Sequence, residues 1–239
     1  MNEVANTGER ILLEKETPLM IARHLCAYKF AAEYVHNKSV LDIGCGEGYG
    51  SYYLSGFAKD VMGIDYDTSI IDYAKTKYQR GNLRFCVVDA KDINTVRDTF
   101  DVICSFQFIE HLGDAQAFLG KVKDLLRNGG VFICSTPNRK DASPNSEAPF
   151  NKFHVKEYLL DEFRELLGVY FKQVEVFGVR RGISLDFFRR LKKIGIFNFL
   201  PEAIDPVRRF YKRIGCDNFD IGSGRIETAL DFIAICKAR

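Results

Sequence analysis

A turn rich in glycine, placed directly after a short apolar run, constrains the fold more than any other feature of the chain. Residues 40–50 read VLDIGCGEGYG, so glycine occupies every second position after Asp42 and Ile43. Glycine permits a positive φ, and it allows a ligand to approach main-chain N–H groups that a Cβ atom would block. A strand, a glycine turn and a helix in this order are typical of ligand sites in open α/β sheets. The segment therefore predicts an α/β protein that holds a ligand at the end of its first strand.

The spacing of these glycines argues against a nicotinamide dinucleotide. The dinucleotide fingerprint is G-x-G-x-x-G, in which the third glycine lies three residues beyond the second. Counted from Gly46, that position is occupied by Tyr49. A nicotinamide-dependent oxidoreductase is therefore the weakest of the enzyme classes that the turn suggests.

The composition is that of an ordinary globular protein. The chain has 239 residues, of which 46% are hydrophobic and 28% charged, and a net charge of +2, so nucleic acid is not expected as a partner. It shows neither the roughly 20 consecutive apolar residues that span a bilayer nor a signal peptide among its first residues. Seven cysteines without a C-x-x-C pair favour a reducing compartment. These features predict a cytoplasmic protein.

Apolar runs of strand and helix type alternate along most of the chain, and a parallel sheet covered by helices follows from this alternation. The runs predict strands over 39–43, 60–65, 83–89, 100–106, 131–135, 170–179 and 226–237, and helices over 18–35, 49–56, 68–78, 114–127 and 155–167. Asn128-Gly129-Gly130 is expected to end the fourth of these helices.

Four segments are predicted from this order. Residues 1–38 form an N-terminal segment with a helix that covers the ligand, and residues 39–179 form the ligand-binding core. Residues 180–225 form a basic helical insertion, and residues 226–239 return to the core as its final strand.

Acidic residues follow three successive predicted strands. Asp42, Asp65 and Asp89 each stand at the carboxyl end of a strand, where open α/β sheets bind their ligands. Asp65 lies 21 residues after Gly44, close to the spacing at which an acid meets ribose hydroxyls. One such aspartate is common in turns, but three of them beside a glycine turn indicate a ligand site.

With these motifs, the chain resembles class I S-adenosylmethionine-dependent methyltransferases, in particular the type 11/type 23 superfamily. The resemblance covers roughly residues 9–179 and is carried by residues 40–50, 61–67, 85–90, 100–112, 129–138, 151–154 and Glu157. It implies a Rossmann-like seven-stranded sheet with an antiparallel last strand and helices on both faces, and the helical insertion at 180–225 precedes that strand in this chain. It also implies S-adenosyl-L-methionine as cofactor, and a setting in cell-surface glycan synthesis.

The resemblance assigns roles to individual residues of this sequence. The glycine turn would offer backbone to the methionine part, Asp65 would accept the ribose hydroxyls, and Asp89 would accept the adenine amino group. The implied cofactor residues are Asp42, Gly44, Cys45, Gly46, Asp65, Tyr66, Asp89, Ala90, Ser105 and Gln107. Plain packing is the alternative for Tyr66 and Ser105. Substrate contact is expected from Tyr28, Phe108 and His154, with a packing or loop role as the alternative for Tyr28 and His154.

His111 is the candidate catalytic residue. Methyl transfer needs alignment more than acid–base groups, but a hydroxyl acceptor must lose its proton, and a histidine suits that task. The alternative for His111 is a helix cap or a packing residue. His24 and His36 are assigned no chemistry, and no metal site is expected because the histidines and cysteines lack ligand spacing.

Residues 180–213 carry ten basic and three acidic side chains, with apolar residues at helical spacing between them. Such a stretch can dock on anionic lipid head groups, which would make the protein membrane-peripheral. It can also bind the phosphates of a nucleotide-linked or lipid-linked sugar. The third alternative is a solvated helix that packs its apolar face on the sheet.

Together these arguments predict a methyltransferase (EC 2.1.1.-) that acts on a small or carrier-linked molecule, with oxygen favoured as the methylated atom. Two alternatives are a quinone- or polyketide-type methyltransferase, which would show a wide apolar acceptor pocket, and a non-catalytic binding module, which would show a blocked cofactor pocket. The acceptor and the oligomeric state do not follow from the sequence.

Overall fold

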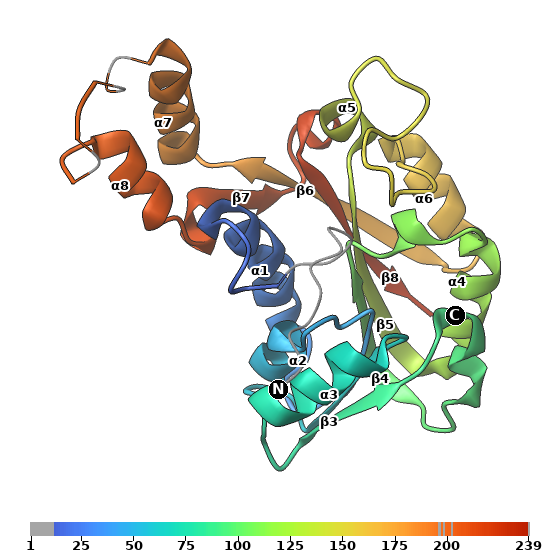
Figure 1. Ribbon diagram of the computed structural model, residues 1–239. Coiled ribbons are helices and arrows are strands. Elements are labelled where there is room, and N and C mark those ends of the chain that lie inside the picture. The colour runs from blue at the N-terminus through green and yellow to red at the C-terminus, as the bar shows by residue number, and fades with distance from the viewer. Residues whose placement is uncertain (1–11, 196, 198, 202, 239) are drawn as a thin grey trace.

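The computed structural model describes residues 12–195, 197, 199–201 and 203–238, and within them the chain forms one eight-stranded sheet with helices on both faces (Figure 1). The strand order is β3-β2-β1-β4-β5-β8-β6-β7. The strands are β1 (Ser39–Ile43), β2 (Asp60–Asp65), β3 (Leu83–Val87), β4 (Phe100–Phe106), β5 (Leu126–Pro137), β6 (Gln173–Arg181), β7 (Phe219–Gly222) and β8 (Asp231–Lys237).

The direction of the strands confirms the predicted α/β fold. β1 to β5 are parallel, and β8 runs antiparallel between β5 and β6. The predicted seven strands are all present, and β7 adds an eighth by pairing antiparallel with the end of β6. β7 is only four residues long, so it gave no alternating pattern that the sequence analysis could detect.

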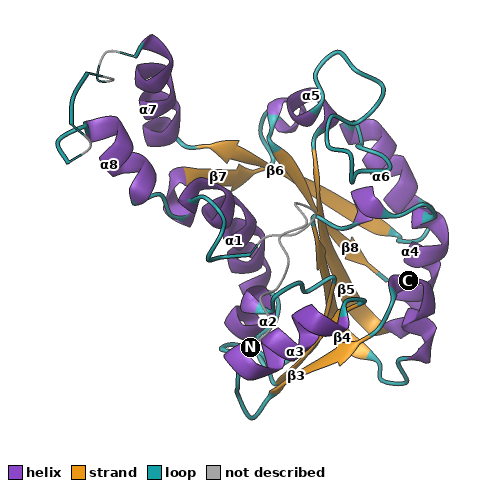
Figure 2. Ribbon diagram, in the orientation of Figure 1, coloured by secondary structure: helices purple, strands orange, loops and turns teal. Residues whose placement is uncertain are grey.

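The helices pack on the sheet in two groups (Figure 2). One core cluster joins β-strand residues such as Leu41 to Phe118 and Phe163, and the other joins Val40 to Ala31. The helices are α1 (Pro18–Ala32), α2 (Tyr49–Leu54), α3 (Thr68–Lys77), α4 (Ala115–Leu125), α5 (Arg139–Ala142), α6 (Leu160–Gly168), α7 (Ile183–Ile194) and α8 (Pro206–Lys212). Short 3₁₀ turns are η1 (Ala90–Thr95), η2 (Ile109–His111), η3 (Cys216–Asn218) and η4 (Ile226–Thr228). No helix among the described residues is long and apolar enough to cross a membrane.

Local signals set several helix starts. The Thr17 side chain accepts a hydrogen bond from the Met20 amide, and Pro18 opens α1. Asp67 and Asp114 cap α3 and α4 in the same way.

Several predicted boundaries were wrong: α1 ends at Ala32 and not at 35, β5 begins at Leu126 and not at 131, and β6 begins at Gln173 and not at 170. α6 begins at Leu160 rather than near 155, because residues 151–158 form a loop that pairs Tyr158 with Asn138. The predicted helix stop at Asn128-Gly129-Gly130 lies inside β5, since α4 already ends at Leu125. The final strand starts at Asp231 because the residues before it form η4.

Candidate active site

The glycine turn after β1 is held to β2 by hydrogen bonds, and its other side faces open space. Gly44 and Gly46 have φ values of 74° and 53°, which are strained for other residues. The Gly44 and Cys45 amides both donate to the Ile64 carbonyl, at 2.9 and 3.0 Å. A Cβ atom on Gly44 would lie 2.4 Å from Phe108, whereas one on Gly46 would meet nothing within 4 Å. The turn therefore leaves room for a ligand beside Gly46.

Asp65 holds this turn from the end of β2. Its Oδ2 accepts a hydrogen bond from the Gly46 amide at 3.1 Å, and its Oδ1 accepts one from the Asp67 amide at 3.1 Å. An ionised carboxylate offers about four lone-pair sites, so a side chain in this place can accept from several donors at once. The neighbouring Tyr66 is 52% exposed and lines the same pocket.

Asp42 anchors the helices around the turn. It is fully buried and accepts hydrogen bonds from the Ser51 hydroxyl at 2.6 Å and from the Tyr28 hydroxyl at 3.2 Å. Burial raises the pKa of Asp42 to about 7. The Tyr28 ring lies so close to Gly50 that a Cβ there would be 1.9 Å from it. Asp42 and Tyr28 thus tie α1 to the glycine turn.

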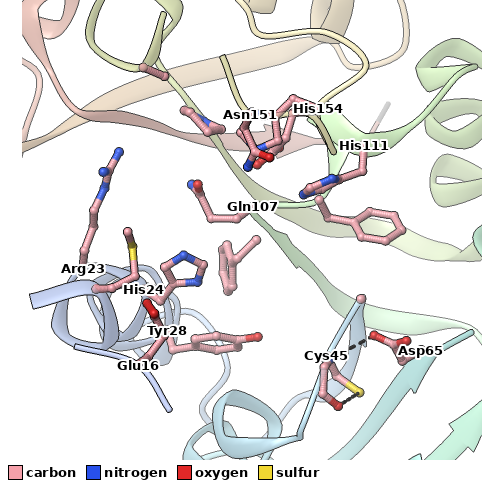
Figure 3. Close-up of a pocket in the computed structure, with 18 of the residues that line it drawn as sticks. Glu16, Arg23, His24, Tyr28, Cys45, Asp65, Gln107, His111, Asn151 and His154 are labelled. Atoms are coloured by element: carbon pink, nitrogen blue, oxygen red, sulfur yellow. Dashed lines mark hydrogen bonds between the residues drawn. The ribbon is translucent and has the colours of Figure 1, made fainter. Parts of the chain in front are cut away.

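A pocket of about 380 Å³ opens above these residues, within the range of roughly 300–1,000 Å³ that small-ligand sites span. Figure 3 shows α1 with Arg23, His24 and Tyr28 on one side, Cys45 and Asp65 below, and His111, Asn151 and His154 above. Three parts of the chain that are distant in sequence therefore meet around one cavity.

The upper wall of the pocket contains two neighbouring histidines, His111 and His154, and each is held by a hydrogen bond to another residue. His111 Nδ1 lies 2.9 Å from the Phe153 carbonyl oxygen. Because that oxygen can only accept, Nδ1 carries the proton, and Nε2 of the neutral ring holds the lone pair. His154 Nδ1 lies 2.7 Å from Glu157 Oε1, and its Nε2 lies 2.9 Å from Asn151 Nδ2. The two imidazole rings are 5.0 Å apart, edge to face.

Two buried acidic side chains, Glu110 and Glu157, lie beside the histidines. Glu110 is fully buried, its Oε2 accepts a hydrogen bond from the Thr136 hydroxyl at 3.0 Å, and burial raises its pKa to about 8. Glu157 is 2% exposed. The second oxygen of each, Glu110 Oε1 and Glu157 Oε2, has no hydrogen-bond partner in the described protein. Both residues line the pocket, and both oxygens are buried, so they are groups that are costly to leave unpaired.

The same loop brings together a possible ligand set for a metal ion. Within the described residues, Glu110, His111 and His154 place one ligand atom each within 4.8 Å of one another. His111 and His154 lack ligand spacing along the sequence, but the turn after β4 and the loop at 151–157 meet in the fold and bring the two rings together. His154 uses both ring nitrogens in hydrogen bonds to Glu157 and Asn151. The absence of a metal requirement stays a prediction.

The α1 wall contributes one basic residue and one neutral histidine. Arg23 forms a two-pronged ion pair with Asp231, at 2.6 Å for each contact, and also donates to the Leu230 carbonyl at 3.2 Å. Burial lowers the pKa of His24 to about 4, so this ring is neutral near pH 7. The positive charge of Arg23 is already neutralised by the carboxylate of Asp231.

Most of the predicted site residues line this pocket. They are Tyr28, Gly44, Cys45, Gly46, Asp65, Tyr66, Gln107, Phe108, His111 and His154. Gln107 has a positive φ of 50°, and its amide donates to the Ser135 carbonyl, a strained conformation of the kind found at functional sites.

Four predicted cofactor residues do not line the pocket. Asp42 lies behind the turn, and the Ser105 hydroxyl is buried at the end of β4 without a hydrogen-bond partner in the described chain. Asp89 is exposed, and its side chain caps η1 by accepting from the Lys91 amide at 2.9 Å. Ala90 packs beside the core. Their predicted contacts with a cofactor stay predictions.

Several residues of the pocket were missed as site residues. They are Arg23, His24, Glu110, Asn151 and Glu157. His24 could have been found, because it lies four residues before Tyr28 and so on the same face of α1. Glu110 adjoins His111, but nothing in the sequence shows which of the two points inward. No sequence signal pairs Arg23 with Asp231.

Comparisons with known proteins agree with this geometry. The model of a methyltransferase domain family matches residues 35–167. The chain is 36% identical over 182 residues to a probable S-adenosylmethionine-dependent methyltransferase of Mycolicibacterium smegmatis, which covers 75% of this chain and 70% of that protein. It is 33% identical over 106 residues to a ubiquinone biosynthesis O-methyltransferase of Cereibacter sphaeroides, and this alignment covers 44% of this chain and 43% of that protein.

Solved structures agree as well. The N-methyltransferase NodS of Bradyrhizobium japonicum, in complex with S-adenosyl-L-homocysteine, superimposes with a TM-score of 0.61 at 14% identity, over 94% of this chain and 89% of that one. This structural similarity shows that the two proteins share a fold.

The open side of the turn at Gly46 and the carboxylate of Asp65 beside it fit an amino-acid-linked nucleoside. Together with the family match, this fit establishes the identity: the chain belongs to the S-adenosylmethionine-dependent methyltransferase family, and its cofactor is S-adenosyl-L-methionine.

Proposed function

We propose that the protein methylates a hydroxyl oxygen of a small or carrier-linked acceptor, with His111 as the general base. S-adenosylmethionine, when bound, supplies the methyl group. The supporting observation is the fixed tautomer of His111: the bond from Nδ1 to the Phe153 carbonyl at 2.9 Å leaves the lone pair of the neutral ring on Nε2. A base in this state takes a hydroxyl proton as the oxygen attacks, a contribution of about 10²–10⁴-fold to the rate.

The cofactor contacts follow the residues that line the lower part of the pocket. Gly44, Cys45 and Gly46 would present backbone to the methionine part, and Asp65 would accept the ribose hydroxyls. Gln107 and Phe108 would border the methionine end, since both line the pocket at the end of β4. Burial raises the pKa of the Cys45 thiol, so Cys45 acts through its main chain and not as a thiolate.

The charge of the upper pocket indicates what the acceptor carries. Glu110 and Glu157 line the pocket, and each has one buried oxygen without a hydrogen-bond partner among the described residues, whereas Arg23 is already paired with Asp231. Burial raises the pKa of Glu110 to about 8, so this acid keeps its proton near pH 7, and an anionic group would find no unneutralised arginine there. We infer an acceptor whose entering part is uncharged or cationic and rich in hydroxyl groups, because hydroxyl groups both donate to and accept from polar side chains such as these. A sugar ring has this character, in keeping with the glycan setting that the resemblance implies.

A quinol-type acceptor is the second candidate. It draws support from the ubiquinone O-methyltransferase relative, although that similarity covers 44% of this chain. Tyr28, Phe106 and Phe108 give the pocket an aromatic side, which would suit a ring with two hydroxyl groups. A wide apolar pocket, the feature expected for this class, does not describe the wall formed by Glu110, His111 and His154. A non-catalytic module would have a blocked cofactor pocket, and the open space at Gly46 argues against it.

A methyl-transfer screen tests the proposal. The protein is incubated with S-adenosylmethionine and separate panels of neutral sugars, nucleotide-linked sugars, lipid-linked glycans, dihydroxy-aromatic compounds and amines. Formation of S-adenosylhomocysteine and the mass and position of the added methyl group are measured. Transfer to a hydroxyl oxygen of a neutral acceptor is the expected result. Transfer only to nitrogen or carbon would reject the oxygen assignment, and binding of the cofactor without transfer in any panel would favour the binding module.

A further inference from the structure

The segment from 183 to 213, called the basic hairpin below, contains α7 and α8 and projects from the edge of the sheet beside β6 and β7 (Figures 1 and 2). We propose that the basic hairpin docks the protein on the surface of an anionic lipid bilayer. This inference extends the proposed function, because it concerns where the acceptor is met, and it can be tested without methyl transfer.

α7 carries two separate apolar faces, and only one is used by the fold. Leu185 is buried, and the Phe188 ring stacks on Phe210 at 4.0 Å, so this face packs α7 against the rest of the chain. Ile183, Phe187 and Ile194 are 91%, 56% and 71% exposed. At 3.6 residues per turn these three positions fall within roughly 40° of one another around the helix. They form an exposed apolar stripe that the fold itself does not require.

The apolar surface continues in the connection between the two helices. Phe199 is 79% exposed and Ile204 is 58% exposed, and the connection lies at the end of the hairpin away from the sheet (Figure 1). Single exposed apolar residues are ordinary on a protein surface. Five large ones on one projecting element are more than solubility favours, and such patches mark contacts with partners or membranes.

Basic side chains flank the stripe. On α7, Arg190 lies along the same line of the helix and Lys193 lies beside it; both are exposed, and neither has an ion-pair partner among the described residues. The acidic residues described in the hairpin are paired, Asp186 with Arg189 at 3.9 Å and Asp205 with Arg208 at 3.2 Å. The exposed charge is therefore positive. An apolar stripe bordered by lysine and arginine is typical of helices that lie in the head-group layer of an anionic membrane.

An anionic lipid surface is the partner that would contact both the exposed apolar stripe and the basic side chains beside it. A nucleic acid would use the basic residues but would gain nothing from exposed Ile183 and Ile194, since its contacts are phosphates and stacked bases. A bilayer surface offers phosphates to the arginines and acyl chains to the stripe.

The hairpin is also joined to both sides of the pocket. At its base, η3 packs on α1, where the Cys26 thiol lies 3.6 Å from the Cys216 carbonyl, and α1 lines the pocket. Arg181, just before α7, pairs with Asp141 at 3.5 Å on α5, and Ala142 of α5 lines the pocket as well. Docking through the hairpin would hold the pocket close to the lipid surface, where an acceptor carried on a lipid is met.

Sedimentation of the full chain with vesicles tests the inference. Phosphatidylcholine vesicles with and without phosphatidylglycerol are compared at low and high salt. We expect binding to the phosphatidylglycerol vesicles only, weakened at high salt because exposed charges are then screened. Absence of binding at low salt would overturn the proposal. Methyl transfer is not measured in this experiment. A failure to bind vesicles would therefore reject the docking inference without rejecting the proposed function.

Two variants separate the contributions. The triple variant Ile183→Ser, Phe187→Ser and Ile194→Ser should weaken vesicle binding about tenfold or more, because it removes the inserted stripe. The pair Arg190→Gln and Lys193→Gln should weaken it about 25-fold at low salt, at roughly fivefold for each basic residue near an anionic surface. The matched control, Val169→Ser with Lys75→Gln, changes one exposed apolar and one exposed basic residue away from the hairpin and should bind as the unchanged protein does.

Retained S-adenosylmethionine affinity shows that each variant is folded. Binding by the folded triple variant equal to that of the unchanged protein would overturn the proposal. So would tight binding of an RNA oligonucleotide in place of vesicles, or a dimer in analytical ultracentrifugation that the triple variant abolishes, since the stripe would then serve another partner.

Discussion

The two halves of the pocket are built in different ways. The cofactor half comes from one continuous turn and one neighbouring strand end, and its contacts are main-chain amides held by Asp65. The acceptor half comes from η2, the loop at 151–157 and α1, and its contacts are side chains in hydrogen bonds with one another. The first half is specified by local sequence, whereas the second exists only once distant segments have met.

The largest expected effect lies in the acceptor half, at His111. His111→Ala should lower kcat on an identified hydroxyl acceptor by about 10²–10⁴-fold, because the proton then has no base. S-adenosylmethionine affinity, measured by calorimetry, should not change. The control His36→Ala removes an exposed histidine and should leave kcat unaltered. Full turnover by His111→Ala would show that His111 is not the general base and that the acceptor half does not supply proton transfer through it.

In the cofactor half, Asp65→Ala should weaken S-adenosylmethionine binding. Loss of a hydrogen bond to a charged group costs about 1.5–3 kcal/mol, or roughly 10–150-fold in affinity. Calorimetric titration measures it, and Asp72→Ala on the exposed side of α3 is the control. Unchanged affinity would mean that main chain alone holds the cofactor and that Asp65 only shapes the turn.

The buried acid of the acceptor half should make stability fall with rising pH. Burial raises the pKa of Glu110 to about 8, above the ordinary value of 4.5. The folded state keeps this proton where the unfolded state has lost it, so the stabilisation is present below pH 4.5 and is lost as pH rises through 8. Between pH 6.5 and 8, where His24 is neutral in the folded state, the loss is on the order of 2 kcal/mol.

Glu110→Gln should reduce this decline to the smaller part that Asp42 contributes, since burial raises the pKa of Asp42 to about 7, and urea unfolding at pH 6.5 and 8.5 measures it. Glu165→Gln, at an exposed position of α6, should leave it unchanged. An equal decline in the Glu110 variant would assign the pH dependence to other groups.

The smallest expected effect is that of metal removal. If Glu110, His111 and His154 act as a hydrogen-bonded network, dialysis against EDTA should leave methyl transfer and thermal stability as they were. Loss of activity that Mg²⁺, Mn²⁺ or Zn²⁺ restores would instead make this trio a metal centre, and the acceptor half would then work through an ion rather than a base.

The sequence predicts the two halves unequally for a physical reason. The position of Asp65 at the pocket could be predicted because a strand end at a known distance from a glycine turn is a regular consequence of alternating elements, while its contact with the ribose stays a prediction. Asp89 shows the limit of this argument. It also stands at a strand end, yet its side chain caps η1 and it is absent from the pocket lining.

In the acceptor half, Tyr28, Phe108, His111 and His154 were predicted as site residues and line the pocket, whereas the contacts between the histidines and their neighbours were not predicted because they depend on long-range pairing. The contact of His154 with His111 requires a loop of irregular backbone to fold back on η2, and no periodic pattern encodes such a loop. Likewise, β7 is too short to be read from alternation, and its pairing with β6 is visible only in the folded sheet.

The ion pair between Arg23 and Asp231 couples the two ends of the chain. Neither β8 nor Asp231 lines the pocket, yet this strand holds in place the helix that does. Breaking this ion pair, as in Asp231→Ala, would accordingly leave the hydrogen bonds of the glycine turn in place and remove one of the contacts that orient α1. A residue of the last strand thus helps to position one wall of the pocket without lining it.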